Sequence, residues 1–250
     1  MPGASRHLPL RFAAGFFAFV FWLPSLALSD LVAGLIPAAS DSSAVGDLAY
    51  GVIGAVLIAP ALASQTRRPE RKIAPLQQVA LVAVALAGAA VATGEDVGLL
   101  GAVVVLVPLL VVLALHPGRR DLLRCPRRPS FPLLVIALAG VVPVVVYASK
   151  MASNGRADRP PEDSFAYVPT LWSAATAMAV AIVLVSLLAA FRPDGWAVPA
   201  ACAAVSAFLF GVASIINADV AASGGRGWGS AAVVWALAYL AAAGREWRTN

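Results

Sequence analysis

The sequence has few charged residues for its length. Only 12% of its 250 residues are charged and 60% are hydrophobic, whereas an average soluble domain is about a quarter charged. Its mean hydropathy of +0.84 is correspondingly high. This shortage of charge excludes an ordinary soluble domain, and the remaining charges lie in short islands between long apolar runs. That pattern is typical of a polytopic helical membrane protein.

Cysteine and histidine are also scarce, with two of each. Cys125 lies in a basic segment and Cys202 in an apolar run. The threading given below places one thiol in the reducing cytosol and the other in the bilayer, so we expect no disulfide. His7 and His116 fall at predicted cytoplasmic helix ends. We expect His116 to cap its helix as a cation, which the C-terminal helix dipole favours, rather than to act in catalysis.

Motifs that would commit the chain to an enzymatic reaction are missing. The sequence contains no P-loop, no GxSxG and no HExxH motif. We therefore predict no catalytic residue, no metal site and no cofactor, and we favour a role other than catalysis. Because no lysine follows Lys150, a retinal Schiff base in the last helices is excluded.

The formal net charge of +5 does not indicate a nucleic-acid partner. The basic residues flank apolar segments and form no stripe along a soluble face, so the predicted partner is the lipid bilayer and no nucleic-acid partner is expected. The preference for Arg over Lys, together with much Ala, Val, Gly and Pro, suggests a high-GC bacterial genome. We predict a multi-pass protein of the bacterial cytoplasmic membrane.

Two basic islands set the predicted orientation. Residues 117–130, near the middle of the chain, carry five arginines and one aspartate, and residues 65–75 form a second island. Lys and Arg are retained on the cytoplasmic side of a membrane, so both islands are predicted to be cytoplasmic loops. With the first four spans before residue 117 and four after residue 130, most Lys and Arg lie inside, and both termini are predicted to be cytoplasmic.

Eight apolar stretches are each close to the roughly 20 residues that cross about 30 Å of hydrocarbon as a helix. They cover residues 12–36, 48–64, 76–93, 97–116, 131–149, 170–191, 196–217 and 228–244. We predict an all-α bundle of eight transmembrane helices that forms one domain, residues 1–250, with no soluble domain. The first stretch exceeds the roughly 7–15-residue core of a signal peptide, so we expect an uncleaved span. Cleavage near residues 38–40 is the alternative.

Polar residues in the first span are candidates for the lining of a solute cavity. Asp30 is the one acid clearly within an apolar run, about 27 Å along the helix from residue 12 and therefore near the outer interface. Ser25 and Ser29 lie beside it. An acid at mid-bilayer would cost roughly 2.5–3.5 kcal/mol and would face the bundle interior, but the cost is smaller at the interface. The alternative to a polar cavity, which we favour, is a helix end that meets water.

The seventh span adds Ser206 and Asn217 to the candidate cavity residues. With Cys202 and Ala213 they form a stripe of small and polar residues on one helical face. Such residues let membrane helices approach closely and form hydrogen bonds between them, so the stripe favours helix packing over solute lining. Pro143, in the middle of the fifth span, is predicted to kink its helix and so free carbonyl groups.

The longest predicted connection, residues 150–169, is placed on the outer side. It mixes charged, polar and aromatic residues and is stiffened by a Pro-Pro pair. We predict that it is a lid over the sixth and seventh span ends, and a solvated linker is an equal alternative. The candidate lid residues are Lys150, Asn154, Arg156, Asp163 and Tyr167.

Aromatic and glycine residues mark the last third of the chain. Trp172 opens an Ala-rich span, Gly195-Trp196 opens the next, and residues 225–229 (GRGWG) precede a span that contains Trp235. In these features the region from about Leu171 to Glu246 resembles small multi-spanning membrane proteins of unknown function from high-GC Gram-positive bacteria. The resemblance implies an integral membrane protein and brings no activity or site residues with it.

Three functions fit these observations. The first, which we favour, is a transporter or permease for a small solute, with a polar cavity among the first, sixth and seventh spans that the outer loop closes. The second is a non-catalytic partner or scaffold subunit, which predicts a packed core without a cavity. The third is an intramembrane enzyme acting on a lipid-linked substrate. It needs convergent acids, histidines or a metal set, in which this sequence is poorest.

Overall fold

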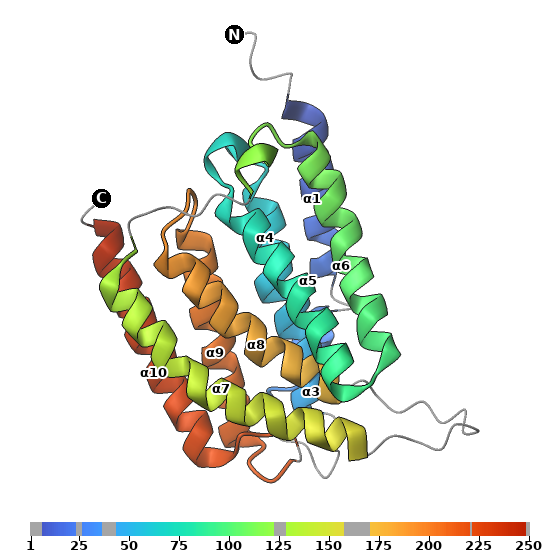
Figure 1. Cartoon of the computed structure of the whole chain (residues 1–250), viewed down its shortest axis with the longest axis vertical. Coiled ribbons are helices and arrows are strands. Elements are labelled where there is room, and N and C mark those ends of the chain that lie inside the picture. Colours follow the sequence, from blue (N-terminus) through green and yellow to red (C-terminus); the bar gives the residue numbers. More distant parts are fainter. Residues whose placement is uncertain are drawn as a thin grey trace.

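The computed structural model describes residues 7–23, 27–36, 44–122, 129–157, 171–220 and 222–248, which form a bundle of helices without strands (Figure 1). Seven helical segments in this part of the chain are long and apolar enough to cross a membrane. Helices suit this setting because each satisfies its backbone hydrogen bonds internally. The spans are a continuous helix of three parts, α3 (Ala44–Gly51), η3 (Val52–Ile58) and α4 (Ala59–Ser64), followed by α5 (Ala74–Thr93), α6 (Asp96–Leu115), α7 (Phe131–Ala157), α8 (Leu171–Ala190), α9 (Ala197–Ile216) and α10 (Gly225–Arg248).

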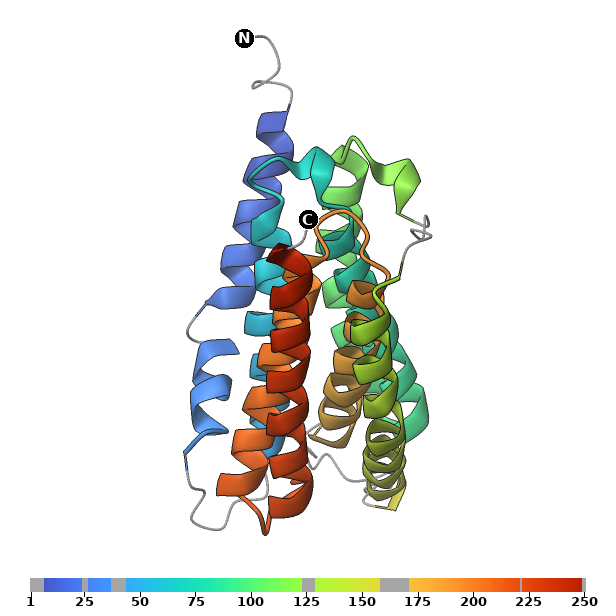
Figure 2. The same cartoon turned by 90° about the vertical axis from the view of Figure 1, so that its left-hand side faces the viewer.

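The first predicted span is interrupted, so the prediction of one continuous helix is wrong. Helix α1 (Leu8–Trp22) ends before Leu23, whose ψ angle of 132° is extended, and α2 covers Ser29–Ala33. Pro24 follows Leu23 in the sequence, and a proline disfavours the helical conformation of the residue before it. Figure 2 shows α2 below α1 along the same edge of the bundle. The two pieces follow the path of one span, although neither alone has the length of a spanning helix.

The helix formed by α3, η3 and α4 packs against this interrupted segment. Gly51 makes the contact close, because a Cβ atom there would lie 2.7 Å from the Cα atom of Leu31 and 2.8 Å from the Ala27 carbonyl oxygen. The middle part, η3, is a π-helix. Its Leu57 carbonyl accepts a hydrogen bond of 2.6 Å from the Gln78 Nε2 group of α5. The π-helix and its partner therefore lie in the buried centre of the bundle.

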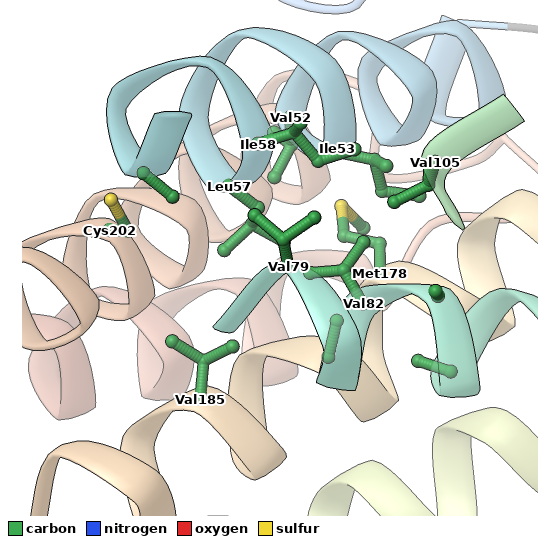
Figure 3. Packing of buried hydrophobic residues seen from close by; sticks show 14 of the residues in the cluster. Val52, Ile53, Leu57, Ile58, Val79, Val82, Val105, Met178, Val185 and Cys202 are labelled. Carbon is green, nitrogen blue, oxygen red and sulfur yellow. The ribbon is translucent and has the colours of Figure 1, made fainter. Parts of the chain in front are cut away.

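The core consists mostly of aliphatic side chains from α8, α5 and the helix of α3, η3 and α4. Figure 3 shows Leu57 facing Val79, and Met178 beside Val82. The spans that begin at Val45 and at Trp172 are the most buried, whereas α7 and α10 are the least buried. Helices α7 and α10 therefore lie at the periphery of the bundle, where their exposed apolar faces would contact lipid.

The Arg-rich connections gather at one end of the bundle. Figure 1 places the start of α1, the end of α10 and the connections that carry Arg68, Arg119 and Arg192 at the same end, opposite the Gly94–Glu95 turn. An even number of crossings would bring both chain ends together in this way. That this end faces the cytoplasm stays a prediction from the distribution of Lys and Arg.

Two boundaries differ most from those predicted. Helix α7 continues to Ala157 instead of ending near residue 149, and α10 is longer at both ends than residues 228–244. Of the central basic segment, residues 119–121 form a short 3-10 helix. Residues 123–128 lie outside the described part of the chain, as does Cys125 among them.

Candidate functional site: a cavity between α7 and α10

A cavity of about 340 Å³ lies among α7, α8, α9 and α10. This volume falls within the roughly 300–1,000 Å³ of small-molecule sites. Almost all of its walls are aliphatic or aromatic. The lining comprises Ala139, Gly140, Pro143, Val144, Val146, Tyr147 and Lys150 of α7, Ala179, Ile182 and Val183 of α8, Ala207 and Phe210 of α9, Ser223 and Gly224, and Trp228, Ala231, Ala232 and Trp235 of α10.

Trp235 lines the cavity on the side of the Arg-rich end, which we call the closed end because contacts of this residue join α10 to α7 there. Its indole Nε1 group donates a hydrogen bond of 2.7 Å to the Ile136 carbonyl of α7, and its ring stacks on Tyr239 with 5.1 Å between centroids. Gly140 leaves room for the indole, because a Cβ atom there would lie 3.1 Å from Nε1. The Tyr239 hydroxyl donates to the Ser186 carbonyl at 2.6 Å. These contacts join α10 to both α7 and α8 at the closed end.

A charged contact near the C-terminus holds the same end together. One Glu246 carboxylate oxygen accepts a hydrogen bond of 2.7 Å from the Ser130 hydroxyl, and the other lies 3.0 Å from a guanidinium nitrogen of Arg192. The Arg192 guanidinium also lies over the Trp196 ring. Glu246 thus connects the start of α7, the α8–α9 turn and the end of α10. Figure 1 shows α7 and α10 converging toward this end and separating toward the other.

The opposite end of the cavity is lined by two exposed residues, and we call it the mouth. Helices α7 and α10 run in opposite directions (Figure 1), so Lys150, the last lining residue of α7, and Trp228, the first of α10, lie at the same end. Both are exposed, Trp228 by 54%. Between the mouth and the closed end, the Tyr147 hydroxyl donates a hydrogen bond of 2.7 Å to the Ala222 carbonyl, and the Tyr147 ring packs edge-on against Phe210.

The lipid-facing side of α7 borders the cavity directly. Val142, Val145 and Val146 are each more than half exposed, and Val146 also lines the cavity. On α10, Val234 and Leu237 are exposed as well. Pro143 lines the cavity and has no N–H to donate to the Ala139 carbonyl one turn earlier. The cavity therefore lies next to the exposed apolar side chains of α7.

The predicted cavity residues of the first and seventh spans lie elsewhere. Asn217 is buried, and its Nδ2 group donates a hydrogen bond of 3.1 Å to the Gly34 carbonyl. This bond joins the end of α9 to the end of α2. Asp30 is half-buried in α2, and the exposed Ser29 hydroxyl lies 3.4 Å from its carboxylate. The Ser206 hydroxyl is buried and has no hydrogen-bond partner among the described residues. None of these four lines the α7–α10 cavity. Ser25 lies outside the described residues.

Three of the predicted lid residues are helical. Lys150, Asn154 and Arg156 belong to the last turns of α7, so the loop prediction is wrong for them. Arg156 donates a hydrogen bond of 3.0 Å to the Ala92 carbonyl in the last turn of α5, where the helix dipole favours a cation. Only Lys150 lines the cavity. Asp163 and Tyr167 lie outside the described residues.

The four residues of the predicted α9 stripe, Cys202, Ser206, Ala213 and Asn217, are all buried, which agrees with a packing role.

Two glycines that the sequence-based predictions did not include form a close contact between α9 and α10. A Cβ atom at Gly211 would lie 2.6 Å from the Gly229 carbonyl oxygen, and one at Gly229 would lie 2.7 Å from that of Gly211. The two backbones meet where neither residue has a side chain, as small residues allow in membrane helices.

His116 follows α6 at the Arg-rich end, as predicted, but its environment is not that of a cation. Its side chain is 2% exposed, and the Gly118 N–H donates to Nδ1 at 3.0 Å. Nε2 lies 3.0 Å from the Pro69 carbonyl and therefore carries the proton. Burial lowers the pKa of His116, although the Pro69 carbonyl opposes this effect. The neutral ring thus accepts a hydrogen bond at Nδ1 and donates one from Nε2, so the prediction of a cationic cap is wrong.

No group of three or more His, Cys, Asp or Glu side chains among the described residues could hold a metal ion. Comparison of the chain with protein-family models, with curated proteins and with solved structures gives no match. The resemblance of residues 171–246 to small membrane proteins of high-GC bacteria therefore stays a prediction. The α7–α10 cavity, which is lined by four helices, is the candidate site that we consider further.

Proposed function

We propose that this multi-pass membrane protein binds a lipophilic molecule from the bilayer in the cavity between α7 and α10. The observation that carries the proposal is an apolar cavity of about 340 Å³ between the two least buried spans. A water-soluble ligand would leave its polar groups unpaired against such walls, which is costly. An alkyl or prenyl chain would leave none.

The binding energy of such a ligand has to come from shape and from its polar end. Lipid tails are already in an apolar medium, so moving a chain from the bilayer into the cavity gains little from the hydrophobic effect. The stacked rings of Trp235 and Tyr239 at one end and Phe210 along one wall provide a rigid surface for dispersion contacts. Selection among lipids would therefore depend on chain shape and headgroup.

The proposal changes the solute expected of a transporter. A carrier of small polar solutes needs polar walls among the first, sixth and seventh spans, whereas the cavity described here has apolar walls and lies among the last four. We infer that any transported molecule is an amphiphile that enters sideways. The membrane concerned would be the bacterial cytoplasmic membrane, with the Arg-rich end inside and the mouth near Lys150 outside.

A pair of substitutions on α10 tests the proposal. Ala232 lines the cavity and is half-buried, so Ala232→Phe fills the space, whereas Ala238 is exposed on the same helix and does not line it. Each variant is purified in mild detergent, and the lipophiles extracted from it are measured by mass spectrometry per mole of protein. The wild type and Ala238→Phe should retain a stoichiometric lipophile that Ala232→Phe loses. Equal retention by all three would contradict the proposal.

A partner-subunit role is the second candidate, and one feature of α5 favours it. Gly88 is exposed, and a Cβ atom there would have nothing within 4 Å. Val84 and Val91 on either side of it are also exposed. Such a small residue on a lipid-facing surface lets another helix approach closely. If it does, Gly88→Leu should shift the protein from a complex to a monomer in sedimentation measurements, and an unchanged sedimentation coefficient would rule the role out for this face.

A further inference from the structure

We propose that the ligand of the α7–α10 cavity is an anionic amphiphile whose phosphate or carboxylate group is bound by Lys150 at the mouth. The inference rests on the proposed function and specifies its ligand class. It follows from the charge of the lining, from the free polar groups at the mouth and from the direction of the cavity.

The charge of the lining favours an anion. Among the described residues that line the cavity, Lys150 is the only charged one, and none is Asp or Glu. Its ammonium group is exposed, and no hydrogen bond or ion pair engages it within the described residues. A cationic headgroup would be repelled there, whereas an anionic one gains a charge-assisted hydrogen bond.

The mouth also supplies hydrogen-bond donors. Trp228 lines the same end of the cavity, and its indole N–H forms no hydrogen bond within the described residues. Indole rings also prefer the headgroup layer of a membrane. The Tyr147 hydroxyl already donates to Ala222. The mouth thus offers a cation and a neutral donor, which matches an acceptor-rich anion such as phosphate or carboxylate.

The cavity extends along α7, away from Lys150. From Lys150 to Gly140 the lining follows α7 for about 15 Å at 1.5 Å per residue. The walls between are mostly apolar, and Trp235, which is bonded to α7, lines the far end. A molecule with its charge at Lys150 would therefore extend an apolar chain toward Trp235, which is the form of an amphiphile and not of a free inorganic anion.

Native mass spectrometry with two competing lipids tests the inference. Purified full-length protein is mixed with equal amounts of phosphatidylglycerol and phosphatidylcholine of identical chains, and the bound adducts are counted. One lysine near a membrane surface contributes enough for about a fivefold preference. Wild-type protein and Lys150→Arg should prefer phosphatidylglycerol by about this factor, and Lys150→Gln should bind both lipids equally. Arg226→Gln removes a charge from an exposed residue outside the lining, and it should keep the preference.

The outcomes separate this inference from the proposed function. An adduct that Ala232→Phe removes, but whose headgroup preference is the same in wild type and Lys150→Gln, overturns the inference and leaves the proposed function standing. An adduct that Ala232→Phe does not remove overturns both. Inorganic phosphate is added as a competitor to distinguish a lipid headgroup from a free anion. Its failure to displace phosphatidylglycerol supports the amphiphile, whereas displacement at equal concentration refutes it.

Discussion

The glycine contact between α9 and α10 allows a quantitative prediction. In Gly211→Ala the new Cβ atom would lie 2.6 Å from the Gly229 carbonyl oxygen and 2.9 Å from the Val233 backbone nitrogen. Both obstacles are backbone atoms, so no side-chain rotation relieves them and α10 must move away. Overpacking of this kind costs about 1–3 kcal/mol, and a backbone clash belongs in the upper part of that range. The better helix propensity of alanine returns up to about 1 kcal/mol.

We therefore expect Gly211→Ala to lower the free energy of unfolding by about 1–2 kcal/mol. The assay is unfolding of purified protein in mild detergent, followed by tryptophan fluorescence. Gly88→Ala in α5 is the matched control, because its Cβ atom would meet nothing within 4 Å, and it should leave stability unchanged or raise it slightly. If Gly211→Ala were as stable as Gly88→Ala, the close approach of α9 and α10 would be refuted.

Three further perturbations test the ends of the bundle. Burial lowers the pKa of His116, so the unfolded chain binds this proton more readily. Stability should thus be constant above about pH 7 and fall as the pH drops through about 6.5, and His116→Gln should remove this dependence of the unfolding midpoint. Glu246→Gln weakens the contact with Arg192 and should destabilise the protein by about 1–2 kcal/mol in the same assay; no change would refute a stabilising contact. Trp235→Phe loses the bond to the Ile136 carbonyl and should cost about 1 kcal/mol, whereas a larger loss than that of Gly211→Ala would contradict the assigned role.

Hydropathy was sufficient to locate most of the helices because each span must satisfy its backbone and face lipid over a similar length. The break after Trp22 was signalled by Pro24, but the apolar run continued across it, and a count of apolar residues does not register backbone conformation. The helical extension of α7 carries Lys150 and Arg156, so composition indicated a loop. Its helical state depends on tertiary contacts, including the bond from Arg156 to the end of α5.

The cavity could not be predicted from residue types. The residues predicted to line a cavity are polar, yet Asn217 joins α9 to α2 by a hydrogen bond. The lining of the cavity is apolar, as is the lipid-facing side of the same helices, so Val144 in the lining and Val145 on the exposed face look alike in the sequence. The cavity exists because α7 and α10 separate from each other. They are held together toward one end, by contacts such as the hydrogen bond from Trp235 to the Ile136 carbonyl. Of the predicted site residues that the structure describes, only Lys150 lines the cavity, and it was predicted as part of an outer loop and not of a helix.

The most direct test of the account is a cryo-electron microscopy map of the protein in nanodiscs made from its native membrane lipids. We expect an elongated density between α7 and α10, with its polar end beside Lys150 and its chain ending against Trp235. A map in which the side chains of α7 and α10 close directly on each other and leave no space between them would contradict a binding site at this position.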